Sequence, residues 1–160
     1  ENLETAYHDG GNMTARHNMA LASFYAGVAF TRAYVGYVHA IAHNLGGLYG
    51  VAHGLANAVI LPHVLEFCRK DAEKKLAKLA IAGGIGTRDE SGETLSRRFI
   101  EKVKTMNADM EIPTVIKELR EKDIPLIAKR ALKEAHPDYP VPRFMTLAEC
   151  EALIRKLLPE

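Results

Sequence analysis

The sequence predicts an all-α fold, a multi-helix bundle with short connections between its helices. Along most of the chain, apolar residues recur at the three- and four-residue spacing of amphipathic helices. No segment shows the strict alternation of a half-buried strand, and none resembles a β-hairpin. The 160 residues suffice for one domain with a real core, so we expect residues 1–160 to form a single helical domain.

The beginning of the chain predicts a loop followed by a long helix. Tyr7 to Asn12 contains the pair Gly10-Gly11 and should be a loop, in which Asn12 can cap the next helix. From Met13 to about Arg32, apolar residues recur at helical spacing. Many of them are alanine or glycine, so a neighbouring helix could approach this one closely.

Two further helices should come next, from about Tyr34 to Leu48 and from Gly54 or Leu55 towards Arg69. Gly46-Gly47 is expected to stop the first of them, which would make 46–54 a glycine-rich connecting loop. Pro62 should end or kink the second, because proline lacks an N–H donor and clashes with the preceding turn.

The rest of the chain predicts shorter helices. Asp71 should cap a helix over Ala72 to Ile81, and a polar turn region should extend from Gly83 to Gly92. Thr146 and Glu149 have the spacing of a capping box for the last helix. Further helices are expected at about 93–106, at 113–119 after Pro113, and at 122–134 with Pro125 in the first turn. The last helix, which begins after Thr146, is expected to end at about residue 158.

Composition excludes several classes of function. Lys and Arg number 21 against 20 Asp and Glu, a balance that attracts neither nucleic acid nor an acidic membrane surface. No signal peptide or transmembrane segment is visible, so the cytoplasm is the expected location. Because the chain begins with Glu1 and not methionine, we expect a processed chain or a fragment.

Cys68 and Cys150 form no CxxC pair and are expected to be reduced, with Cys68 packed as a small hydrophobe.

Three of the seven histidines fall close together in an otherwise apolar segment, at His39, His43 and His53. His39 and His43 are four residues apart and share one face of a helix, so both rings could reach one metal ion. His53 comes after the glycine-rich loop, which could fold it back onto that face. A zinc protease motif is excluded, because it needs glutamate directly after the first histidine and Ala40 stands there. Burial of several titratable side chains is costly, so a functional cluster is the better interpretation than core packing.

The remaining histidines carry weaker signals. His63 is next to Pro62 and is expected to lie at the surface or to pack. The other three lie in polar surroundings and are expected to be solvated: His8, His17 and His136.

The stretch GYVHAIAHNLGGLYGVAHGLANAVILPHV resembles the signature of the iron-containing (group III) alcohol dehydrogenases. The matching elements are His39, His43, His53-Gly54, Ala56-Asn57-Ala58 and Leu61-Pro62, and the flanking segments agree, so the resemblance covers essentially the whole chain. It implies the helical domain of the dehydroquinate-synthase-like and iron alcohol dehydrogenase fold. One departure is Ala52, where the family usually has proline, which leaves this loop slightly freer.

The resemblance also implies a division of roles. His39 and His53 are implied to be two of four metal ligands, the others being an Asp and a His on a helix upstream of this chain. His43 is implied to lie beside the nicotinamide and the substrate, and not on the metal; it would either relay the alcohol proton or orient the cofactor. Phe30 is implied to line the substrate pocket. The family's N-terminal NAD(P)-binding α/β domain is absent from this sequence.

The implied function is metal-dependent, NAD(P)-linked interconversion of alcohols and aldehydes or ketones by hydride transfer, in an assembly that is a dimer or larger. The implied metal is Fe²⁺, with Zn²⁺ as the alternative in a glycerol-dehydrogenase-like enzyme, since both ions accept histidine and carboxylate ligands. A second alternative is a truncated or stand-alone helical domain with no catalytic activity. We expect the 160-residue chain alone to lack NAD(P)-dependent turnover and to hold metal weakly or not at all.

Overall fold

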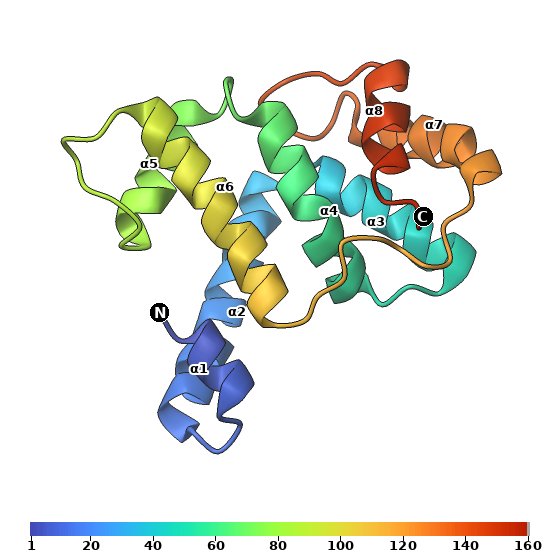
Figure 1. Ribbon diagram of the computed structural model, residues 1–160. Coiled ribbons are helices and arrows are strands. Elements are labelled where there is room, and N and C mark those ends of the chain that lie inside the picture. The colour runs from blue at the N-terminus through green and yellow to red at the C-terminus, as the bar shows by residue number, and fades with distance from the viewer. Residues whose placement is uncertain (160) are drawn as a thin grey trace. The chain divides into compact units, whose positions relative to one another are not determined.

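All regular structure in the computed structural model is helical over residues 1–159, the part of the chain that is described (Figure 1). The helices are α1 (Leu3–His8), α2 (Met13–Ala33), α3 (Tyr37–Tyr49), α4 (His53–Cys68), α5 (Glu73–Ala82), α6 (Gly92–Asp109), the 3₁₀ helix η1 (Glu121–Asp123), α7 (Ile124–Ala135) and α8 (Leu147–Arg155). The predicted all-α fold is confirmed. The chain divides into two compact units, residues 1–34 and the residues from Val35 onward.

The first unit consists of α1 packed against α2. The predicted loop is shorter than expected, because Tyr7 and His8 belong to α1 and only residues 9–12 form the connection. The predicted cap is confirmed: the Asn12 side chain accepts a hydrogen bond from the backbone N–H of Ala15 over 3.0 Å. This bond satisfies one of the orphan donors of the first turn of α2.

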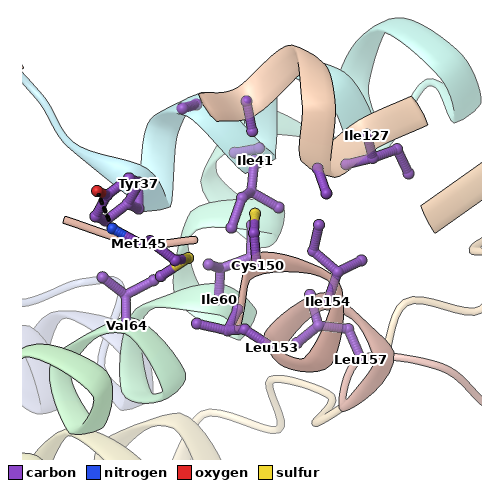
Figure 2. Packing of buried hydrophobic residues seen from close by; sticks show 14 of the residues in the cluster. Tyr37, Ile41, Ile60, Val64, Ile127, Met145, Cys150, Leu153, Ile154 and Leu157 are labelled. Atoms are coloured by element: carbon purple, nitrogen blue, oxygen red, sulfur yellow. Dashed lines mark hydrogen bonds between the residues drawn. The ribbon is translucent and has the colours of Figure 1, made fainter. Parts of the chain in front are cut away.

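The core of the second unit lies where α3, α4, α7 and α8 meet. Helix α3 packs against both α4 and α7, and α8 packs against α7. Figure 2 shows the buried side chains that these helices contribute, which include Ile41, Ile60, Ile127, Cys150 and Ile154. A smaller cluster between α5 and α6 contains Ala77, Ala80 and Leu95. Burial of these faces is what stabilises helices whose sequences are otherwise only moderately helix-forming.

The end of α3 differs from the prediction. Gly46 and Gly47 lie inside the helix, which continues to Tyr49 and ends at Gly50. Gly50 has a φ of +70°, the left-handed conformation that glycine adopts without strain, and its N–H donates to the Gly46 carbonyl over 2.9 Å. Two internal glycines cost about 2 kcal/mol of helix propensity. Packing of the buried face around Ile41 offsets this cost, and only residues 50–52 connect α3 to α4.

Helix α4 continues through Pro62, which the sequence predicts to end or kink it. A regular helix would pair the N–H of residue 62 with the carbonyl of Ala58, and proline has no such N–H. The side chain of Asn107 on α6 takes this place, since its Nδ2 donates to the Ala58 oxygen over 2.8 Å. A partner from another helix therefore satisfies the acceptor that Pro62 leaves free.

The other shorter elements are partly as predicted. Asp71 does not cap α5, whose N-cap is Ala72 with no side-chain hydrogen bond. Residues 113–119 form turns and no helix, because Ile116 donates its backbone N–H to Leu157 and not along its own segment. The capping box of Thr146 and Glu149 is confirmed at the start of α8.

Both cysteines are buried and free, as expected, and both belong to the main core cluster. Over residues 1–159, no helix is both long and apolar enough to cross a bilayer.

Candidate metal centre

Helix α3 presents His39 and His43 on one face. Its opposite side is anchored in the core by Ala40, Ile41 and Leu45, all fully buried. The four-residue spacing then places both histidines away from that anchor, one turn apart. The His39 side chain is partly buried, whereas 46% of the His43 side chain is exposed.

The turn at Gly50 brings a third histidine to the same place. His53 is the first residue of α4, and its ring centroid lies 5.3 Å from that of His39 and 5.3 Å from that of His43. The His39 and His43 centroids are 6.1 Å apart. The His43 and His53 rings are stacked, with 12° between their planes. The fold thus brings together the three histidines that the sequence singled out.

The donor set is suited to a divalent ion but is incomplete. Imidazole nitrogen is a good ligand for both Fe²⁺ and Zn²⁺. Within residues 1–159, however, no group of three or more His, Cys, Asp or Glu side chains is arranged to hold a metal ion.

The surroundings of His39 favour its neutral form. Burial lowers the pKa of His39 below its usual value, and the nearby His53 and His43 lower it further, while Glu134 opposes this effect. A histidine must be neutral to bind a metal ion. The environment therefore favours the neutral imidazole of His39 near neutral pH.

His43 has a partner that the sequence did not suggest. Its Nδ1 lies 2.7 Å from Oε1 of Glu134 on α7, and the same oxygen accepts a hydrogen bond from the Tyr139 hydroxyl over 2.9 Å. These three residues link α3 to the end of α7 and the segment after it. The contact could not be foreseen from spacing, because Glu134 is distant in sequence and is one of many carboxylates on helix surfaces.

The remaining histidines differ in their surroundings. His8 and His17 are exposed, as predicted, and His63 is partly buried. The expectation that His136 is solvated is wrong: it is partly buried, and its Nε2 lies 2.6 Å from the Tyr37 hydroxyl. That hydroxyl also accepts the backbone N–H of Met145, a contact drawn in Figure 2. The Tyr37 hydroxyl therefore joins the start of α3 both to His136, at the end of α7, and to the segment before α8.

Phe30 lies on α2, in the first unit, and its ring is exposed. Its role in a substrate pocket therefore remains a prediction.

The family model described as "Fe-containing alcohol dehydrogenase family, C-terminal" matches residues 1–158. The chain belongs to the Fe-containing alcohol dehydrogenase family. The resemblance noted from the histidine signature is thereby confirmed, and the helical fold agrees with it.

Named members of the Fe-containing alcohol dehydrogenase family are similar over nearly all of the chain. The 1,3-propanediol dehydrogenase of Klebsiella pneumoniae is 39% identical over 157 residues, which cover 97% of this chain and 40% of that protein. Alcohol dehydrogenase 4 of Saccharomyces cerevisiae is 40% identical over 162 aligned residues, covering 98% of this chain and 40% of that protein. A solved 1,3-propanediol oxidoreductase structure matches with a TM-score of 0.89 at 37% identity, covering 98% of this chain and 41% of that one. The chain thus spans about two fifths of the length of these relatives.

Proposed function

We propose that this chain is the helical, metal-binding part of an NAD(P)-linked alcohol dehydrogenase that interconverts small alcohols and their aldehydes or ketones by hydride transfer. The observation that carries the proposal is the convergence of His39 and His53 from two helices, with ring centroids 5.3 Å apart. His39 and His53 are the proposed metal ligands, and the rest of the donor set is proposed to come from outside this chain.

The metal is proposed to be Fe²⁺, in keeping with the family, with Zn²⁺ as the alternative. A bound divalent ion supplies Lewis-acid polarisation of the alcohol or carbonyl oxygen. The protein's own part is to hold the reactants in line, since hydride transfer depends on orientation. Metal analysis of the purified enzyme separates the iron from the zinc alternative.

His43 is proposed to lie beside the nicotinamide and the substrate. Its side chain is 46% exposed, as expected for a residue that meets a bound molecule. There it would orient the cofactor or pass the alcohol proton to solvent.

Phe30 is proposed to line the substrate pocket through its exposed ring. The enzyme is proposed to be cytoplasmic and homo-oligomeric, with a small alcohol or aldehyde as its substrate and without nucleic-acid or membrane partners.

A second candidate function is a helical domain that binds metal weakly and catalyses nothing by itself. The absence of a three-ligand group within residues 1–159 favours this for the chain in isolation. We expect no alcohol turnover with NAD⁺ or NADP⁺ from the 160-residue chain alone. Turnover by the purified chain would overturn this expectation.

The test uses the longer polypeptide that the proposal requires, with an NAD(P)-binding domain ahead of this chain. Oxidation of propane-1,3-diol is measured anaerobically with added Fe²⁺ for the wild type, His39→Ala, His53→Ala and His17→Ala. Loss of a ligand should lower kcat by roughly 100-fold or more, because the loss of a residue that only supports a metal ligand can already have an effect of this size. The exposed His17 is the matched control and its replacement should change little. Equal activity of the His39→Ala and His17→Ala variants would contradict the proposal.

A further inference from the structure

Glu134 occupies a fixed position beside His43. It lies in the last turn of α7, whose buried Ala131 and Ala135 are fixed in the core that α7 shares with α3. Its side chain is 31% exposed. Its Oε1 lies 2.7 Å from Nδ1 of His43 and 2.9 Å from the hydroxyl oxygen of Tyr139. Two hydrogen bonds to one oxygen leave this carboxylate little freedom to turn away.

These two bonds determine which nitrogen of His43 carries the proton. A carboxylate has only acceptor atoms, so both groups that contact Oε1 must donate to it. Tyr139 donates its hydroxyl hydrogen. His43 must therefore carry a proton on Nδ1, and in the neutral ring Nε2 is then the atom with the free lone pair. Within residues 1–159, His43 has no other hydrogen bond.

We propose that Glu134 is a positioning residue for His43. It holds the imidazole in the Nδ1–H tautomer and fixes the ring plane, so that Nε2 is presented as an acceptor on the exposed side of α3. Tyr139 acts one step further away by holding the Glu134 carboxylate. What Nε2 then meets, a cofactor or an alcohol hydroxyl, rests on the proposed function, whereas the tautomer itself does not.

The tautomer is measured directly in this chain, without metal or cofactor, by long-range ¹H–¹⁵N correlation of the histidine ring nitrogens. In the wild type, His43 should show a protonated Nδ1 and an unprotonated Nε2. Glu134→Ala should shift the ring towards the Nε2–H form, which is the usual preference of a free imidazole. Glu134→Gln should restore the wild-type pattern, because its amide oxygen still accepts from Nδ1. The exposed Lys133, in the same turn of α7, provides the control Lys133→Ala, which should leave the pattern unchanged.

Two results would overturn the proposal. One is an Nε2–H tautomer of His43 in the wild type, a result that requires no variant to fold. The other is an unchanged tautomer in Glu134→Ala when its circular dichroism shows the native helix content. Tyr139→Phe should keep the Nδ1–H form but broaden the His43 signals, because the carboxylate gains freedom.

A kinetic comparison in the longer enzyme separates this proposal from the proposed function. Glu134→Ala should lower kcat by about 10- to 100-fold, as for other groups that orient a functional histidine. KM and metal content should stay near wild type, and Glu134→Gln should recover most of the loss. If the wild-type enzyme shows no alcohol turnover at all, the proposed function fails while the tautomer measurement still decides the role of Glu134. Loss of kcat that Glu134→Gln does not recover would contradict positioning through a hydrogen bond.

Discussion

The amide nitrogen Nδ2 of Asn107 on α6 donates to the carbonyl oxygen of Ala58 on α4 over 2.8 Å. That oxygen is the acceptor for residue 62 in a regular helix, and Pro62 cannot donate to it. Asn107 is partly buried and fastens α6 to α4 at this point. The helix that carries His53 therefore continues past its proline with support from a neighbouring helix.

This relationship predicts a coupling between Asn107 and Pro62. Asn107→Ala should lower the free energy of unfolding by about 0.5–1.5 kcal/mol, because it removes the donor to a partly buried carbonyl. In the Pro62→Ala background the loss should be smaller, since the new N–H of residue 62 can reach Ala58. Urea unfolding of the two single variants and the double variant measures the coupling. Equal losses of unfolding free energy in both backgrounds would contradict this coupling. The exposed Asp109 in the same helix offers the control Asp109→Ala.

Ala52 offers a second prediction, at the position where the family usually has proline. Its φ of −56° is within the range that proline adopts, and within residues 1–159 its N–H makes no hydrogen bond. Ala52→Pro should therefore stabilise the protein by about 0.4–1 kcal/mol, by restricting the unfolded chain. The shift in the urea midpoint measures this gain. A lower midpoint would mean that the connection between α3 and α4 must change its path to accept proline.

The thiols of the two cysteines should be unreactive in the folded protein. Burial raises the pKa of Cys68 to about 11 and that of Cys150 to about 12. The reactive thiolate is therefore scarce near pH 8, and both groups lie within the core. Ellman's reagent should detect almost no thiol until denaturant is added, after which two per chain should react. Rapid reaction of either thiol in native buffer would contradict the packing described for α4 and α8.

His63 should make stability depend on pH. Burial lowers its pKa, and the neighbouring Lys156 and Lys104 lower it further. Because the unfolded chain then takes up the proton more readily than the folded one, stability falls as the pH drops from above the unfolded value of 6.5 through the lower folded value. His63→Gln should weaken the fall in Tm between about pH 7.5 and pH 5. An unchanged pH dependence would show that His63 does not titrate differently on folding.

The sequence predicted most of the helices because their apolar spacing is a local property. The α2 segment, the Asn12 cap and the Thr146–Glu149 capping box depend on residues within one or two turns of each other, and they are confirmed. Predictions from local sequence were wrong where a residue distant in sequence supplies a hydrogen bond. The helix does not end at Pro62, because Asn107 donates to the carbonyl that the proline leaves free. Residues 113–119 form no helix, because Ile116 donates its N–H to Leu157.

The same distinction applies to the candidate site. His39, His43 and His53 could be identified because they crowd into one apolar segment, and the fold brings their rings together. Glu134 could not be identified, because nothing in its local sequence marks it and its meeting with His43 depends on how α7 packs against α3. Which of the three histidines bind metal came from the family resemblance, and spacing alone would have paired His39 with His43.

The central claim, that His39 and His53 hold the divalent ion and His43 does not, is tested most directly by metal affinity. Co²⁺, a spectroscopic substitute for Fe²⁺, is titrated into the longer enzyme that carries the proposed NAD(P)-binding domain. The Kd is compared for the wild type and for His39→Ala, His53→Ala and His43→Ala. We predict that the first two variants bind roughly tenfold or more weakly, and that His43→Ala stays close to wild type. A loss of affinity in His43→Ala as large as that in His39→Ala, or wild-type affinity in His53→Ala, would contradict the account.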